Sequence, residues 1–335
     1  MNDRTRRLLE WALRGRLLGI IAFQILLIVV FTSVTPSFAG PQNMLGVALN
    51  GSVIVLVACA EAVVVITRNY DLSVGSIVGL ASYVGMDMAR LHPDWGPLIV
   101  CIPIGIGAVC GIVNGWLVAY GRVNSVIATL GTLSIYRGLA FIYANGQQVN
   151  PDQIPGWIPA TVDGNVAGIP TLIIIAVVVV AALALGLRYL PLGRQMYAVG
   201  SNPSAGAYYG LRSASVVLRA YLLCGALVGA ASFLYAAQVA YIVPFLATGL
   251  ELTALAAVVI GGVSFFGGSG NVIGAAIGAL ALATIASGLV HLAAPDYVRQ
   301  FVQGAAIILA VALDALISGR ARGMLGTVRA RVGAQ

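Results

Sequence analysis

Long apolar runs recur from one end of the chain to the other, separated by short polar stretches. A run of about 20 residues crosses a hydrocarbon core about 30 Å thick as an α-helix, which satisfies its own backbone hydrogen bonds. The alternating pattern of a membrane β-barrel is absent. The pattern predicts an all-α, polytopic membrane helix bundle with a single transmembrane domain over residues 1–335. The ten predicted spans are 17–35, 43–67, 72–87, 98–120, 125–144, 169–190, 215–239, 250–264, 271–290 and 298–317.

The third and eighth spans are short, and each adjoins a polar segment that contains glycine. AVVVI at 62–66 matches AAVVI at 256–260, and GSIVG at 75–79 resembles GNVIG at 270–274. Paired interrupted segments in the two halves of a membrane protein indicate a transport path. Chance similarity between apolar sequences is the alternative. The pattern predicts a faint internal repeat with broken segments at Asp71 and at 267–270.

The charges indicate an orientation in the membrane. Hydrophobic residues make up 60% of the chain and charged residues 9%, and all 18 basic residues are arginine. Without lysine, the chain has no G-x-x-x-x-G-K phosphate loop. With the N-terminus inside, fifteen arginines face the cytoplasm, only Arg90 and Arg299 face outward, and Arg137 lies within a span. This asymmetry predicts that both termini are cytoplasmic, together with a basic tail at 318–335.

The connection at 191–212 is too long to serve only as a turn between packed helices. Asn202 is a candidate N-cap and Pro203 a candidate first helical residue, so we expect about two helical turns that end at Gly210. Two adjacent tyrosines would give such a helix a rigid contact surface. We interpret 191–212 as a cytoplasmic docking segment for a soluble partner. An interfacial helix resting on lipid headgroups is the alternative, and 145–168 is the long outer loop.

A few ionisable and hydroxyl side chains fall within or at the edges of the spans. Asp71 and Ser73 follow the second span, where they can line a pore, cap the next helix, or do both. Glu251 and Thr253 open a short span, and an acid is favoured at a helix N-terminus. Arg137 and Glu61 are costly to bury, and we expect them to pair with each other. We therefore predict a substrate pathway that contains Asp71, Ser73, Arg137, Glu251 and Thr253.

Several other classes of site are excluded. His92 and His291, the only histidines, lie in predicted outer loops without carboxylate or cysteine neighbours at ligand spacing, so we expect neither a metal site nor a catalytic site. The four cysteines lie within spans and are expected to be buried thiols.

Glycines at intervals of four residues predict helix packing faces. These are 107, 111 and 115; 225 and 229; and 270, 274 and 278.

The residues carry a family resemblance over nearly the whole chain. VITRNYDLSVGS at 65–76, IATLGTLSIYRG at 127–138 and GLELTALAAVVIGG at 249–262 resemble motifs of permease subunits of bacterial ABC monosaccharide importers, of the ribose/xylose type. TRN at 67–69 and YRG at 136–138 are most similar to the rhamnose and autoinducer-2 branch. Arg137 and Glu251 fall on motif positions of this family.

The resemblance implies a multi-pass protein of the bacterial plasma membrane that works by alternating access. It implies two cytoplasmic ATPase subunits that use ATP, an extracytoplasmic sugar-binding protein, and a second permease subunit, identical or related. The chain itself would bind no cofactor and no nucleic acid. An ion-coupled secondary sugar carrier, using Glu61 or Asp71 as a titrating group, is the alternative.

The resemblance also places the family's ATPase-coupling segment at 200–210. Relatives often have Glu-Ala-Ala followed by glycine, whereas this chain has Pro203 at the glutamate position. The departure argues against a coupling role for an acidic side chain there. The implied coupling residues are Arg194, Asn202, Ser204, Ala205, Tyr208, Tyr209 and Gly210.

Overall fold

The computed structural model describes residues 3–208, 210–295, 297–298, 300–302, 304–306, 308–309 and 312. Over these residues the regular secondary structure is helical apart from one small hairpin and one isolated bridge, so the all-α prediction is confirmed. The α-helices are α1 (Asp3–Val34), α2 (Pro41–Ile66), α3 (Val74–Leu91), α4 (Cys101–Ala119), α5 (Ser125–Ala144), α6 (Trp157–Asp163), α7 (Thr171–Tyr189), α8 (Pro191–Ser201), α9 (Pro203–Tyr208), α10 (Ser213–Val239), α11 (Leu250–Ile260) and α12 (Val272–His291). Between them lie the 3-10 helices η1 (Pro36–Ala39), η2 (Pro93–Val100) and η3 (Pro151–Gln153), and the strands β1 (Asn165–Val166) and β2 (Ile169–Pro170).

The long helices agree with most of the predicted spans. Among the described helices, seven are long and apolar enough to cross a membrane: α1, α2, α4 with η2, α5, α7, α10 and α12. The third and eighth predicted spans coincide with α3 and α11. The 11 residues of α11 rise only about 17 Å, too little to cross a bilayer. Half of the span at 298–317, and all of the tail at 318–335, lie outside the described residues.

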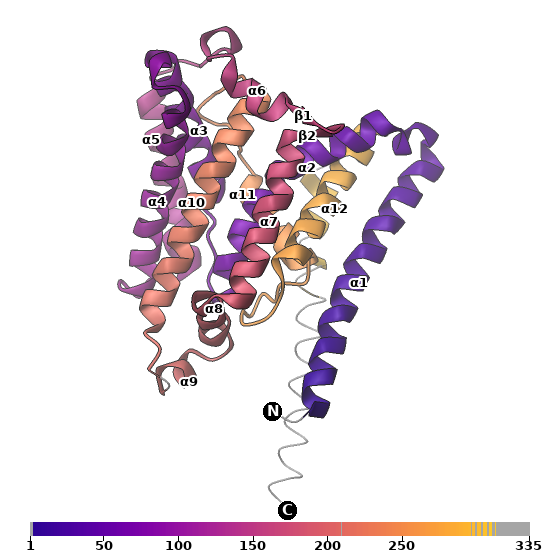
Figure 1. Ribbon diagram of the computed structural model, residues 1–335, viewed down its shortest axis with the longest axis vertical. Coiled ribbons are helices and arrows are strands. Elements are labelled where there is room, and N and C mark those ends of the chain that lie inside the picture. The colour runs from indigo at the N-terminus through magenta and orange to yellow at the C-terminus, as the bar shows by residue number, and fades with distance from the viewer. Residues whose placement is uncertain are drawn as a thin grey trace, which may run out of the picture.

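The helices run between two ends of the molecule (Figure 1). The start of α1, together with α8 and α9, lies at one end, and α6 with the β1–β2 hairpin lies at the opposite end. We call these the α9 end and the α6 end. The N-terminal helix and the segment at 191–212, which are predicted to share a side of the membrane, therefore lie at the same end of the molecule. Which end faces the cytoplasm stays a prediction.

Helix α2 forms the centre of the bundle. In its most apolar stretch 83% of the residues are buried, whereas in α1 the share is 6%. Helix α1 packs along α12, where Gln24 donates a hydrogen bond to the Thr284 hydroxyl at 2.9 Å. A helix that is apolar on all sides belongs in a protein core or in lipid. The two extremes fit α2 in the core and α1 at the lipid boundary.

The predicted glycine faces are confirmed as packing surfaces. Helices α4 and α10 pack along Gly107 and Gly111 against Gly225 and Gly229, where a side chain at Gly107 would meet the Gly229 Cα at 2.9 Å. In the same way, α12 packs against the end of α11. Small residues let helix backbones approach closely within a membrane.

The segment at 191–212 differs in part from its prediction. Helix α9 starts at Pro203 and ends before Gly210, which has a left-handed φ of 76°, as expected. The preceding residues, however, form helix α8, which the sequence pattern does not predict. The hydrophobic positions Met196 and Val199 of α8 are buried, so α8 is packed onto the bundle.

Candidate functional site

The chain reverses direction directly after α2. Helix α2 ends at Ile66, Arg68 has a positive φ of 67°, and the Asp71 amide donates to Glu61 Oε1 at 3.0 Å. Glu61 lies five residues before the end of α2, so the chain has returned about 7.5 Å along that helix. The predicted break between the second and third helices is therefore present, and it places Asp71 inside the bundle.

Asp71 is the centre of a buried polar cluster. Its Oδ1 accepts hydrogen bonds from the Ser73 amide at 2.9 Å and the Ser73 hydroxyl at 2.6 Å. Asn114 Nδ2, from α4, lies 3.2 and 3.1 Å from the two Asp71 oxygens and 2.8 Å from Ser73 Oγ. Tyr136 of α5 donates to Asn114 Oδ1 at 3.1 Å. We call Asp71, Ser73, Asn114 and Tyr136 the Asp71 cluster.

The sequence pattern predicts two of the four residues of this cluster. Asp71 and Ser73 lie together, and the Asp71 carboxylate accepts the Ser73 amide, but Ser73, the N-cap residue of α3, makes no side-chain capping hydrogen bond to that helix. Asn114 and Tyr136 were missed. Asn114 is a fully buried amide within an otherwise apolar helix, and such intramembrane polar residues are usually bonded to a partner. The position of Asn114 in the middle of a predicted span could have identified it as a candidate site residue.

A second irregular segment lies between α10 and α11. Residues 240–249 begin at the α6 end, where Ile242 pairs with Val149. The segment then follows α3, with the Leu246 carbonyl against Gly79 and the Ala247 carbonyl against Gly75. Non-helical backbone at membrane depth is tolerated where protein buries it or where it lines a cavity.

Arg137 and Glu251 meet next to this segment. Arg137 Nη2 of α5 lies 3.5 Å from Glu251 Oε1, in the first turn of α11. The expected pairing of Arg137 with Glu61 is wrong, because Glu61 faces the Asp71 amide instead. Arg137 Nη2 and Glu251 Oε2 are two of the five side-chain atoms that are buried without a hydrogen-bond partner among the described residues. The others are Gln24 Oε1, Glu61 Oε2 and Trp157 Nε1. Such groups retain capacity for a further ligand.

A cavity of about 650 Å³ opens beside α11. Thr253, a predicted pathway residue, lines it and donates a hydrogen bond to the Gly249 carbonyl at 3.0 Å. Its other lining residues were not predicted. They include the polar side chains Asn50, Tyr235, Thr248 and Gln300. A cavity of this size with a few polar groups is typical of a small-molecule site.

Helix α8 holds the two predicted broken segments together at the α9 end (Figure 1). The Gly268 amide donates to the Ile66 carbonyl at 2.8 Å, which joins the segment after α11 to the end of α2. From α8, Ser201 Oγ donates to the Gly268 carbonyl at 3.1 Å and Tyr197 to the Gly270 carbonyl at 3.0 Å. Burial raises the pKa of Tyr197 above its ordinary value, which keeps the hydroxyl protonated as a donor.

The predicted coupling residues are distributed over α8 and α9. Arg194 is exposed on α8 and donates to the Tyr189 carbonyl at 3.0 Å. Asn202 lies between the two helices, and its carbonyl accepts the Gly206 amide at 3.0 Å. Ser204, Ala205 and Tyr208 belong to α9, and Gly210 follows it. Tyr209 lies outside the described residues.

Comparison with known proteins identifies the family. Residues 43–311 match the family described as the permease component of the branched-chain amino acid transport system. This chain belongs to that permease family. The ribose import permease protein RbsC of Escherichia coli (strain K12) is 34% identical over 300 residues, which cover 87% of this chain and 91% of RbsC.

Relatives with a different transport role are similarly close. The autoinducer 2 import system permease protein LsrC of Shigella flexneri is 32% identical over 296 residues, covering 86% of this chain and 85% of LsrC. LsrC of Photorhabdus laumondii subsp. laumondii is 33% identical over 281 residues, covering 82% and 81%. No solved structure matches this chain significantly.

Family membership fixes the class of protein. The chain is a multi-pass membrane permease component of an ABC transporter and is not itself an enzyme. Among the described residues no three His, Cys, Asp or Glu side chains group as a metal site would require. His92 instead stacks on Trp95, with ring centroids 4.3 Å apart.

Proposed function

We propose that this permease is the pore subunit of an ATP-driven importer for a monosaccharide or a sugar-like small molecule. The observation that carries the proposal is the similarity, over nearly the full length, to permeases named for ribose import and autoinducer 2 import. The family description also names branched-chain amino acids, which are the competing substrate class. Ribose, rhamnose and autoinducer 2 are the first ligands to test.

The arrangement of polar groups can bind a hydroxylated solute. Arg137 and Glu251 offer a donor and an acceptor beside each other, and the nearby cavity carries hydroxyl and amide side chains. A sugar hydroxyl both donates and accepts hydrogen bonds, so it can satisfy both members of such a pair. An amino acid also offers an ammonium and a carboxylate to this pair, so the choice of a sugar over an amino acid rests on the similarity to the named permeases. In this proposal Asp71 and Ser73 shape the pathway, and Thr253 lines it.

The proposed mechanism is alternating access. A pair of ATPase subunits uses ATP and acts on α8 and α9, an extracytoplasmic binding protein delivers the solute, and a second permease subunit completes the pore. The α9 end would face the cytoplasm, as the distribution of arginines predicts. The absence of lysine, and so of a phosphate loop, agrees with ATP hydrolysis by a separate chain.

Uptake by the reconstituted complex tests the substrate and the energy source together. We expect labelled ribose, rhamnose or autoinducer 2 to enter vesicles only when ATP, the ATPase and the binding protein are all present. Branched-chain amino acids should not compete. Uptake that needs no ATPase but collapses with a proton uncoupler would instead favour the secondary carrier.

Coupling is tested at α9. Replacing Tyr208 and Tyr209 with aspartate should leave ATP hydrolysis active and reduce uptake per ATP consumed, because the rigid contact surface is lost. Ala198→Ser, an exposed change on α8, is the control. Unchanged coupling in the tyrosine variant would exclude these residues as the docking surface.

A further inference from the structure

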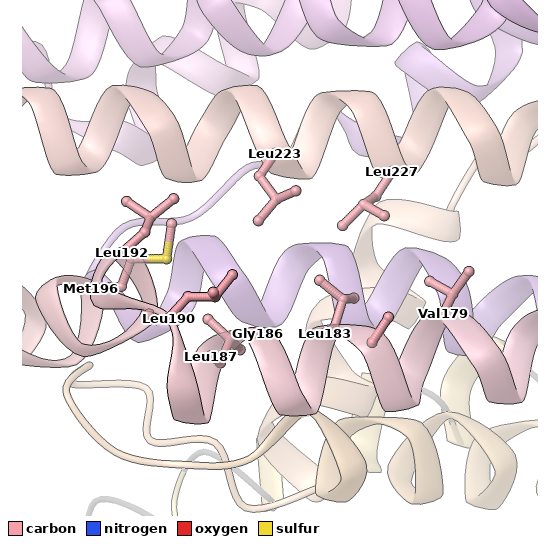
Figure 2. A pocket seen from close by; sticks show the side chains of 11 residues that line it. Val179, Leu183, Gly186, Leu187, Leu190, Leu192, Met196, Leu223 and Leu227 are labelled. Atoms are coloured by element: carbon pink, nitrogen blue, oxygen red, sulfur yellow. The ribbon is translucent and has the colours of Figure 1, made fainter.

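A hollow between α7, α8 and α10 takes no part in the proposed pathway. Its volume is about 310 Å³, and every residue that lines it is apolar. Figure 2 shows Leu223 and Leu227 of α10 pointing across the hollow toward Leu183 of α7. Leu192 and Met196, at the start of α8, close one end of it.

The hollow adjoins a surface suited to lipid. Helix α7 exposes large apolar side chains on its outer face, including Val177, Val178 and Leu185. Apolar cavities of this kind do not hold water, because water finds no hydrogen-bond partners there. Lipid tails are as apolar as leucine, so an acyl chain can fill the space between α7 and α10 without a desolvation penalty.

Three arginines are close in sequence to residues that line the α8 end of the hollow, and two of them, Arg188 and Arg194, contact Tyr189. Arg188 lies next to Leu187 on α7, and Arg194 lies next to Gly193 on α8. Arg219 precedes Leu223 by one turn and shares its face of α10. All three are exposed, and within the described part of the chain none forms an ion pair with a carboxylate.

We propose that this hollow binds one anionic phospholipid. An acyl chain lies between α7 and α10, and the phosphate is bound by Arg188, Arg194 and Arg219. Guanidinium groups bind phosphate oxygens in bidentate fashion, and several basic side chains at a membrane surface favour anionic lipids. The apolar lining selects a lipid over a soluble phosphate compound, and the arginines select an anionic headgroup.

The site lies at the base of α8, so a bound lipid would also act on coupling. Leu192 and Met196 contact the lipid from the same helix that holds Gly268 and Gly270 through Ser201 and Tyr197. This second step rests on the proposed function. We expect anionic lipid to raise uptake per ATP consumed, whereas the lipid site itself can be tested without ATP or solute.

Native mass spectrometry of the permease released from vesicles tests the lipid site directly. From a mixture of phosphatidylcholine and phosphatidylglycerol, the unmodified protein should retain phosphatidylglycerol preferentially. The double variant R188Q/R194Q should reduce that preference roughly thirtyfold, because two basic side chains are lost. The variant L223F/L227F should lose retention of both lipids, because its larger rings fill the hollow. R122Q and I142F, at exposed positions on the α4–α5 connection and on α5, are the controls and should match the unmodified protein.

Other occupants predict different results, each of which would overturn the proposal. Equal retention of both lipids by the unmodified protein would exclude an anionic site. Binding of inorganic phosphate alone, with the same sensitivity to R188Q/R194Q, would show a free-phosphate site. If L223F/L227F separated permease dimers without changing lipid retention, a second copy would occupy the hollow. If L223F/L227F does not fold, the result for R188Q/R194Q, whose substitutions are at exposed positions, still tests the proposal.

Discussion

The Asp71 cluster and the Arg137–Glu251 pair are both buried polar groups in an apolar bundle, yet they differ in how completely they are satisfied. Asp71 receives donors from Ser73 and Asn114, and Asn114 is in turn held by Tyr136. Arg137 and Glu251 lie 3.5 Å apart, and each has a buried atom without a hydrogen-bond partner among the described residues.

This difference separates two kinds of buried polarity. A fully satisfied network holds helices in one arrangement, and losing one member leaves the others unpaired. A partly satisfied pair costs stability unless something else uses its free atoms, so it points to a ligand. We therefore assign the Asp71 cluster to the architecture of the break after α2 and the Arg137–Glu251 pair to the solute.

The largest expected effect comes from opening the satisfied cluster. Asn114→Leu removes the amide donor from Asp71 and should lower the free energy of unfolding by about 3 kcal/mol, because a buried carboxylate loses a hydrogen bond. Thermal unfolding in detergent measures the loss, with Val113→Leu, an exposed neighbour on α4, as the control. An Asn114→Leu protein of full stability would show that the Asp71 cluster is not architectural.

The open pair should behave in the opposite way. Arg137→Gln or Glu251→Gln should leave the unfolding temperature nearly unchanged and reduce uptake by about thirtyfold, as expected when a ligand loses a charge-assisted hydrogen bond worth about 2 kcal/mol. Arg90→Gln, which breaks the ion pair with Asp87 at 2.6 Å, is the control for removal of an arginine. A large fall in stability with normal uptake by the remaining folded protein would place the pair with the architecture instead.

The sequence predicts the long helices and the broken segments, but only part of the candidate site. Hydrophobic run length predicted α2, α4 and α5 because a span must be continuously apolar. The same criterion does not predict the irregular backbone of residues 240–249, because these residues are themselves apolar and resemble an ordinary loop or helix end. Its course along α3 follows from packing against Gly75 and Gly79, which sequence spacing does not reveal.

Pairings between distant helices were the least predictable feature. Arg137 was recognised as costly to bury, but its partner depends on the rotation of α5 and on the depth of α11. The sequence argument named Glu61, whereas the structure pairs Arg137 with Glu251. Helix α8 was missed for a different reason, since its short amphipathic pattern of buried Met196 and Val199 was interpreted as part of a polar loop.

The smallest expected effect concerns the contact between α8, the segment after α11 and the end of α2. Ser201 reaches the Gly268 carbonyl, and Gly268 in turn bonds to Ile66, at the end of the helix that carries Glu61. Ser201→Ala removes one neutral hydrogen bond worth about 1 kcal/mol, so uptake per ATP should fall about fivefold while substrate affinity stays unchanged. The ratio of uptake to hydrolysis measures this, with Ala198→Ser as the control on the same helix. A change in affinity without a change in that ratio would mean that α8 acts on the solute site rather than on coupling.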